Sequence, residues 1–317
     1  YDDTMPEEIN RKVADVCSKL YFVPTKQSAI NLALEGISRE KIFITGNTIV
    51  DACFRHIEIA ENRENIDETL KNLLKLDNIL TLTIHRAENT DEKQRLENII
   101  KALVDLKEYN IIFPIHPRTT KKLKEFNLYE DFAKNDHIHI VEPLGYLDFL
   151  LLMSKSKLIL TDSGGLQEEA ITLNIPVLTL RYNTERPETV SAGGNILVGA
   201  DTDKITDLAN VVLNNKDFAG KMKEAKNPYG NGDTGEKIIN IIENSQKEGT
   251  LEIKSPEEIM TSFKSNIKQI NEEISVKEFE EKYNSRIRIV YNKNSIEFPE
   301  DDLSLFNKLV FFDSYSS

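Results

Sequence analysis

Several features are scarce or absent in this 317-residue sequence, and each absence excludes a class of protein. Cysteine occurs only at Cys17 and Cys53, which excludes a disulfide framework and a thiolate metal site. No apolar stretch approaches the ~18 residues of a membrane span, because the most apolar window, residues 147–153, is short and contains an aspartate. No apolar segment typical of a secretory signal lies near Tyr1. These absences predict a cytoplasmic protein.

Positive charge is in the minority. The 40 lysines and arginines are outnumbered by 53 aspartates and glutamates, which gives a formal net charge of −13 at pH 7. A field of that sign disfavours nonspecific binding to nucleic acid or to an anionic membrane, so we expect neither as a partner. If the ligand is an anion, a few local groups must attract it against this field. A hydrophobic content of 39% still predicts a globular protein with a real core.

The middle of the chain alternates short apolar runs with helical patterns. The runs are separated by roughly 20–30 residues, which is the spacing of βα units in a parallel sheet. Runs that are apolar on both faces suit a sheet that helices cover on both sides. We therefore predict a doubly wound α/β domain with strands at residues 79–84, 111–115, 137–141, 158–160, 177–180 and 196–198.

The flanking regions predict that the chain has more than one domain. Its length agrees, since a domain has roughly 150 residues. Residues 20–23 and 42–44 are predicted strands, too few for a stable sheet with both faces buried. The polar segment 61–68 is the expected linker. Residues 250–317 form a charged tail without glycine, in which we find no chemistry. Because the chain begins at Tyr1 without methionine, we expect it to be the interior of a longer protein.

The string TDSGGLQEE at residues 161–169 follows the fourth apolar run. A strand, a Ser-Gly-Gly turn and a helix leave backbone N–H groups free at the helix N-terminus, where a phosphate can bind. Gly164 and Gly165 allow the backbone to approach such a ligand closely. Glu169, one turn further, is placed to accept hydrogen bonds from sugar hydroxyls. The alternative is a helix capped by Ser163 whose acids match its dipole, and the string alone does not decide between them.

Two further polar clusters follow strands of the same predicted sheet. Arg186, in the string TERPE at 184–188, can contact a phosphate or fix a carboxylate. His85 and Arg86, in the string HRAEN at 85–89, can stabilise negative charge on a leaving group. Each string has a simpler interpretation, a surface ion pair in the first case and a capped helix start in the second. Ligands of open α/β sheets bind at the carboxyl ends of the strands, so three clusters at that edge together favour a binding site.

Other residues are weaker candidates. His116 follows another strand and repeats this placement. His137 and His139 share one face of a strand, but without a third ligand nearby we expect no metal site. Phe149 is most simply a core residue, although it can also stack on a base. Glu7 is most simply an acid in the first turn of a helix.

Taken in order, these strings resemble the non-hydrolysing UDP-N-acetylglucosamine 2-epimerases. The resemblance covers about residues 3–245. It rests on the ordered set of MPEEINR at 5–11, TGN at 45–47, HRAEN at 85–89, HPR at 116–118, TDSGGLQEEA at 161–170, ERPE at 185–188 and NPYGNG at 227–232.

The resemblance implies an α/β, GT-B-like fold. A doubly wound, parallel, Rossmann-like domain at 61–226 would bind UDP, and residues 1–60 would be the remnant of a first Rossmann-like domain. Residues 227–249 would form a terminal helix that packs back toward the first domain, and the tail at 250–317 has no counterpart in the family.

The implied activity is that of an isomerase without a cofactor. Such enzymes interconvert UDP-N-acetylglucosamine and UDP-N-acetylmannosamine. They eliminate UDP across C1–C2 to give a 2-acetamidoglucal, and then add UDP back with C2 protonated on the other face. This chemistry needs carboxylates as base and acid, and cationic help for the departing diphosphate.

The resemblance also implies roles for particular residues. Glu7 resembles a catalytic carboxylate, and His85 resembles the histidine beside the diphosphate. Arg86 and His116 resemble part of a regulatory site for a second UDP-N-acetylglucosamine. The implied UDP site consists of Phe149 at the uracil, Ser163, Gly164 and Gly165 at the diphosphate, Glu169 at the ribose, and Arg186 at the phosphate.

Part of the family pattern is missing from this sequence. Members carry several βα units ahead of the MPEE string, and these include two more catalytic acids. We therefore expect the chain to bind UDP but to epimerise poorly by itself, with a homodimer or a partner chain supplying the missing half. Two alternatives stay open: a hydrolysing epimerase that releases UDP and free N-acetylmannosamine, and a UDP-binding subunit.

Overall fold

The computed structural model describes residues 6–252, 288–289 and 296–297, with side chains from Glu8 to Glu252. The chain divides into two compact units, residues 1–247 and 248–317. In the second unit the described residues include two short antiparallel strands, β9 (Arg288–Ile289) and β10 (Ile296–Glu297). Most of the predicted charged tail lies outside the described residues.

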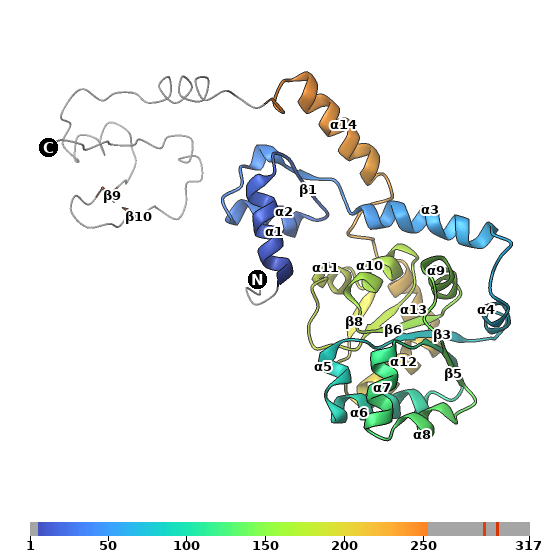
Figure 1. Ribbon diagram of the computed structural model, residues 1–317. Coiled ribbons are helices and arrows are strands. Elements are labelled where there is room, and N and C mark those ends of the chain that lie inside the picture. The colour runs from blue at the N-terminus through green and yellow to red at the C-terminus, as the bar shows by residue number, and fades with distance from the viewer. Residues whose placement is uncertain (1–5, 253–287, 290–295, 298–317) are drawn as a thin grey trace, which may run out of the picture. The chain divides into compact units, whose positions relative to one another are not determined.

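A six-stranded parallel sheet is the centre of the first unit (Figure 1). Its strands lie side by side in the order β5-β4-β3-β6-β7-β8, which is the doubly wound order that reverses direction between β3 and β6. All six strands predicted from the apolar runs are confirmed, and none of their ends is shifted by more than one residue. They are β3 (Ile79–Thr83), β4 (Asn110–Pro114), β5 (Ile138–Val141), β6 (Leu158–Thr161), β7 (Val177–Thr179) and β8 (Asn195–Leu197).

Helices cover both faces of this sheet, as strands without a polar face require (Figure 1). Alternate strand residues such as Leu80 and Leu160 pack on one face and residues such as Ile79 and Ile159 on the other. The first face is covered by α6 (Lys93–Asp105), α7 (Pro117–Glu125), α8 (Tyr129–Ala133), α12 (Thr202–Asn214) and α13 (Lys216–Lys223). The second face is covered by α4 (Glu68–Leu73), α9 (Tyr146–Ser154) and α10 (Gly164–Thr172).

The N-terminal residues form a second, two-stranded parallel sheet, as predicted. It pairs β1 (Tyr21–Val23) with β2 (Ile42–Ile44) and carries α1 (Pro6–Cys17), α2 (Lys26–Leu34) and the short 3₁₀ helix η1 (Arg39–Lys41). Its core is small and centres on Tyr21, Val23 and Leu32. Ile9, Val13 and Val16 lie one turn apart on α1 and are exposed by 56%, 61% and 84%. A large part of the apolar surface of this sheet and its helices therefore faces outward.

A long helix, α3 (Thr48–Asn62), joins the two sheets and was not predicted from the sequence. It packs against α9 and α10, and the Asn47 side chain caps its first turn. In the same first turn Asp51 accepts hydrogen bonds from the backbone N–H groups of Thr234 and Gly235, which begin α14 (Thr234–Lys247). Two short helices complete the unit, α5 (Ala87–Thr90) and α11 (Pro187–Ser191).

Gly46, in the turn before α3, cannot carry a side chain without a shift of the backbone. Its φ is +95°, and a Cβ there would lie 2.6 Å from the Tyr229 carbonyl oxygen. We expect Gly46→Ala to lower the free energy of unfolding by about 3 kcal/mol, because positive-φ strain and a backbone clash add together. Gly36 is the matched control, since its φ is +92° but no atom lies within 4 Å.

Gly36→Ala should cost only the strain of about 1 kcal/mol. Urea denaturation of the two variants measures both values. Equal losses for the two would show that the close approach to Tyr229 has no energetic weight.

The two cysteines differ in accessibility. Cys17 is exposed on α1, whereas Cys53 is buried on α3, where burial raises the pKa of its thiol to about 12. Because the thiolate is the reactive form, iodoacetamide should modify Cys17 and leave Cys53 intact in the folded protein. Mass spectrometry of tryptic peptides checks this, with labelling in urea as the control that reaches both. Modification of Cys53 without denaturant would contradict the burial of α3 against α9 and α10.

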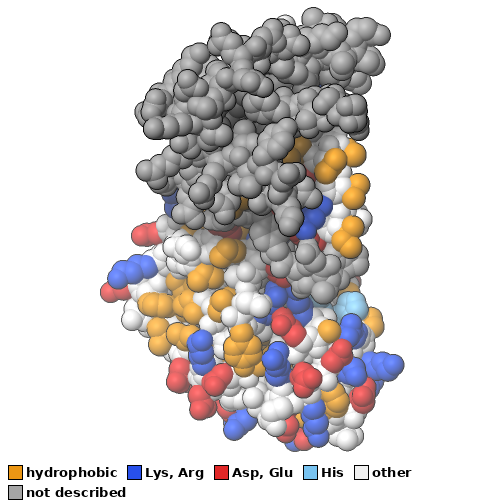
Figure 2. Space-filling view, turned by 90° about the vertical axis from the view of Figure 1, so that its left-hand side faces the viewer, with side chains coloured by type: hydrophobic (Ala, Val, Ile, Leu, Met, Phe, Trp, Pro, Cys, Tyr) orange, Lys and Arg blue, Asp and Glu red, His pale blue; other side chains and the backbone are white. Residues whose placement is uncertain are grey.

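The surface of the described residues mixes lysine, arginine, aspartate and glutamate side chains (Figure 2). Within the described ranges, every helix is too short or too polar to cross a membrane.

Candidate functional site

Asp162 organises the carboxyl edge of the sheet at the point where the strand order reverses. It directly follows β6, is fully buried, and accepts hydrogen bonds from the backbone N–H groups of His85 and Arg86 at 3.1 and 2.9 Å. Its carboxylate also accepts from the Asn89 side chain at 3.2 Å and lies 3.0 Å from Nδ1 of His85. One buried carboxylate therefore fixes both the loop after β3 and the orientation of the His85 ring.

The N-terminus of α10 lies one residue further along. Ser163 is the N-cap residue, but its side chain makes no capping hydrogen bond, so the alternative of a serine-capped helix is wrong. A Cβ on Gly164 would lie 3.2 Å from a Glu185 carboxylate oxygen and 3.7 Å from a guanidinium nitrogen of Arg86. Gly165 has open space around it. The helix start is thus open at Gly165 and flanked by charged side chains at Gly164.

One network joins four charged side chains at this edge, those of Arg86, Glu185, Arg181 and Glu88. Arg86 Nη1 donates to Glu185 at 3.1 Å, and Arg181 donates to Glu185 at 2.9 Å and to Glu88 at 2.6 Å. Partial burial acts to raise the pKa of Glu185, but the hydrogen bond from Arg181 and the charges of both arginines lower it to about 2. Glu185 therefore stays ionised at neutral pH. The network pairs two arginines with two glutamates, so it carries no excess of positive charge.

Arg186 completes the group from the start of α11. Its Nε donates to Glu168 at 2.6 Å, and its Nη1 donates to the Glu185 carbonyl oxygen at 3.1 Å. Glu168 belongs to the second turn of α10, so Arg186 lies against the helix whose N-terminus is open. The sequence clusters at 85–89, 161–169 and 184–188 do meet at one edge of the sheet.

Glu169 and Phe149 lie behind this edge. Glu169 is 7% exposed, and burial raises the pKa of its carboxyl, while the neighbouring Tyr146 hydroxyl acts in the opposite direction. Phe149 is half-buried and packs against the cluster that contains Met153 and Ile159. Both side chains belong to adjoining helices, α10 and α9, on one face of the sheet.

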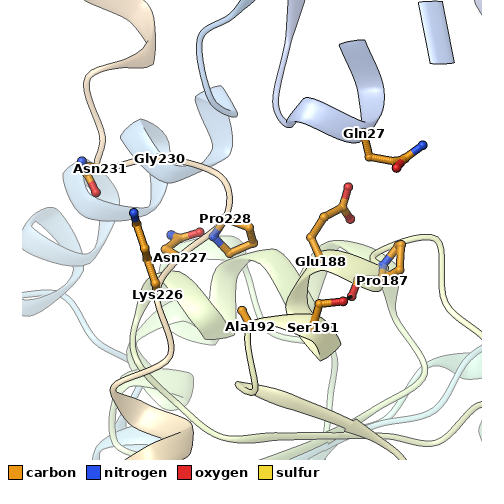
Figure 3. Close-up of a pocket in the computed structure, with 10 residues that line it drawn as sticks. All are labelled: Gln27, Pro187, Glu188, Ser191, Ala192, Lys226, Asn227, Pro228, Gly230 and Asn231. Carbon is orange, nitrogen blue, oxygen red and sulfur yellow. Dashed lines mark hydrogen bonds between the residues drawn. The ribbon is translucent and has the colours of Figure 1, made fainter. Parts of the chain in front are cut away.

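A cavity of about 680 Å³ opens beside α11, directly after Arg186 (Figure 3). Glu188 points into the space between Gln27 of α2 and Pro228, and its carboxylate accepts a hydrogen bond from the Thr25 hydroxyl at 2.9 Å. The residue that follows β1 of the two-stranded sheet by two positions, Thr25, therefore contacts α11 beside the charged cluster.

Other candidates lie apart from this cluster or have structural contacts. The His116 ring caps α7 by accepting from the Arg118 N–H at 3.2 Å. The His137 ring bonds the Leu103 carbonyl and the His139 ring bonds Asn110. No group of three or more metal-ligating side chains occurs in the part of the chain that the structure describes. Glu7 lies in α1, but its side chain is outside the described residues.

Sequence reasoning overlooked the supporting residues of the site. Asp162 and Glu168 stood inside the quoted string, but their roles depend on partners that are distant in sequence. The partners of Asp162 are more than 70 residues away, and those of Glu168 are more than 17 residues away. Arg181 carried a readable signal, since it follows the end of β7 at the same sheet edge as the three clusters.

Comparison with known proteins identifies the family. The family model described as UDP-N-acetylglucosamine 2-epimerase matches residues 1–243. The chain belongs to this family. A UDP-N-acetylglucosamine 2-epimerase of Methanocaldococcus jannaschii is 48% identical over 245 residues, which are 76% of this chain and 65% of the relative. One of Methanococcus maripaludis is 46% identical over 250 residues, 78% of this chain and 67% of the relative.

A solved structure of this epimerase family shares the fold. The crystal structure of the M. jannaschii epimerase in complex with UDP-GlcNAc and UDP matches with a TM-score of 0.67 and 48% identity. The match covers 77% of this chain and 66% of that chain. The predicted α/β, GT-B-like fold class is thereby confirmed. The chain spans about two thirds of the length of these 2-epimerase relatives.

Proposed function

We propose that this chain binds the UDP part of UDP-N-acetylglucosamine at the open N-terminus of α10. The observation that carries the proposal is the convergence of His85, Arg86 and Arg186 on a helix start that Ser163 leaves uncapped. Backbone N–H groups at such a helix start bind phosphate oxygens, and guanidinium groups bind them in a fixed fork. The name of the solved M. jannaschii relative, which holds UDP-GlcNAc and UDP, supports this choice of ligand.

The individual roles are part of the proposal. The diphosphate would lie at Ser163, Gly164 and Gly165, with Arg186 at a phosphate. The ribose would lie at Glu169, and the uracil would pack on Phe149, whose half-buried ring belongs to the adjoining helix.

His85 would assist the leaving group. Its bond to Asp162 occupies Nδ1 as a donor, so an imidazolium ring would present its second N–H, at Nε2, to the diphosphate. As C2 loses its proton, the C1–O bond breaks and UDP leaves with the electron pair; positive or proton-donating groups at the diphosphate stabilise that charge. Glu7 would be one carboxylate for proton transfer at C2. Arg86 and His116 would contribute to a regulatory site for a second substrate molecule.

We further propose that the reaction catalysed is UDP-N-acetylglucosamine 2-epimerisation rather than hydrolysis, as the names of the relatives indicate. Residues 61–226 would be the UDP-binding domain. Residues 1–60 and the helix within 227–249 would lie on the side of the bound ligand that carries the sugar. A homodimer or a partner chain would cover the outward apolar face of α1, where Ile9, Val13 and Val16 are exposed.

Isothermal titration of UDP into the purified chain tests the binding proposal, with uridine as the control that lacks phosphate. We expect saturable heat with UDP and a much weaker response to uridine. Incubation with UDP-N-acetylglucosamine, followed by nuclear magnetic resonance of the products, separates UDP-N-acetylmannosamine from free N-acetylmannosamine. Absence of UDP binding would refute the proposed site, and free N-acetylmannosamine would establish the hydrolysing alternative.

A further inference from the structure

We propose that Glu168 is a positioning residue that holds Arg186 toward the anion site and joins it to the turn before α3 through Asn47. The proposal rests on the proposed UDP site, in which Arg186 contacts a phosphate. The proposed UDP site assigns no contact with the ligand to Glu168 or Asn47.

The geometry places Glu168 between two donors. One carboxylate oxygen, Oε1, accepts from Nε of Arg186 at 2.6 Å and from Nδ2 of Asn47 at 3.1 Å. Glu168 thus binds the Nε side of the guanidinium, and the Glu185 carbonyl oxygen accepts a hydrogen bond from Nη1. Among the contacts of the described residues, Nη2 of Arg186 has no protein acceptor. The guanidinium is therefore fixed through Nε and Nη1 and keeps Nη2 available, as recognition of a phosphate requires.

The burial of Glu168 argues against a role in stability alone. Its side chain is 9% exposed, and desolvation raises the pKa of its carboxyl in spite of Arg186 and Asn47. An ion pair whose carboxylate is desolvated in this way gains little net stability, because the cost of removing the charge from water offsets much of the attraction. Its retention is better explained by the orientation that it imposes on Arg186 than by a gain in stability.

Asn47 is itself rigidly placed. Its backbone N–H donates to the Tyr229 carbonyl at 2.8 Å, and its side-chain oxygen accepts from the Ile49 N–H at 3.0 Å. Gly46, directly before it, has a positive φ, and a Cβ on it would lie 2.6 Å from the same carbonyl oxygen. Asn47 therefore presents its amide to Glu168 from a fixed turn, and its loss should leave Glu168 with one partner fewer and more freedom.

The experiment titrates UDP calorimetrically into the full chain and into four variants, with circular dichroism to confirm that each is folded. We expect Glu168→Ala to weaken UDP binding about tenfold or more, the effect of losing a charge-assisted hydrogen bond. Glu168→Gln keeps an acceptor for Nε and should stay within about threefold of the unaltered chain. Asn47→Ala should weaken binding by a smaller factor. Glu61→Ala, which removes an exposed carboxylate paired with Lys155, is the matched control and should have no effect.

The double variant Glu168→Ala/Arg186→Ala decides whether Glu168 acts through Arg186. We expect it to bind UDP no more weakly than Arg186→Ala alone. A loss equal to the product of the two single losses, or normal binding by Glu168→Ala, would overturn the positioning role while leaving the UDP site intact.

If the unaltered chain does not bind UDP, the proposed function fails and urea unfolding decides the remaining question. Non-additive unfolding midpoints for the Glu168 and Arg186 variants would then support the holding contact alone, and additive midpoints would exclude it.

Discussion

Replacing Asp162 with alanine should lower the free energy of unfolding by about 4 kcal/mol, because several buried donors lose their acceptor at once. The donors are the backbone N–H groups of His85 and Arg86 and the Asn89 side chain. Asn89 keeps its bond to the Leu180 carbonyl, but the loop after β3 loses its attachment to β6. Urea denaturation followed by circular dichroism measures the loss.

The matched control is Asp91→Ala. Asp91 pairs with the Arg118 guanidinium at 2.6 Å, but both side chains are more than 40% exposed, so the loss should stay below about 1 kcal/mol. Asp162→Asn should fall between the two, because an amide retains one acceptor oxygen and turns a donor toward the others. Equal stability of the Asp162 and Asp91 variants would show that the Asp162 contacts do not hold the loop.

Replacing Arg186 with alanine should weaken UDP binding by about 100-fold, which corresponds to loss of strong charge-assisted hydrogen bonds to a phosphate. The effect should appear for UDP and not for uridine, since uridine offers no phosphate. Arg186→Lys should recover only part of the loss, because lysine keeps the charge but has neither the Nε donor for Glu168 nor the planar fork.

Calorimetric titration at two salt concentrations measures these affinities and their dependence on charge. The surface arginine Arg118 supplies the control, because Arg118→Ala removes a comparable charge far along the sequence from α10 and α11. A UDP affinity in Arg186→Ala equal to that of the unaltered chain would remove Arg186 from the site.

The fold was predictable where the chain's chemistry is local. Each of the six apolar runs corresponds to one strand, because a strand that is buried on both faces consists almost entirely of apolar residues. The helix α3 was not predicted, although Asn47 is a good N-cap and Asp51 suits a first turn. Its buried positions, Val50, Cys53 and Ala60, repeat with helical spacing and offered the missing signal.

The candidate site was predictable as a location but not as a set of contacts. Parallel strands put their carboxyl ends together, so the clusters around His85, Ser163 and Arg186 had to share one edge. The contact of Asn47 with Glu168 spans 121 positions, and no periodicity or motif carries information on such a pair. Ser163 shows the same limit, because the side chain of an N-cap serine usually accepts a hydrogen bond from the first turn, and that of Ser163 does not.

The central place of β3 has a consequence for how this protein acquires its structure. β3 is the first strand of its sheet in the chain, yet it pairs with β6 through Leu80 and Leu158, after a long intervening segment. β3 and β4 can associate early, but the other edge of β3 waits until β6 has left the ribosome. Such non-local closure slows folding, and the waiting edge is the one that a chaperone or another nascent chain would meet first.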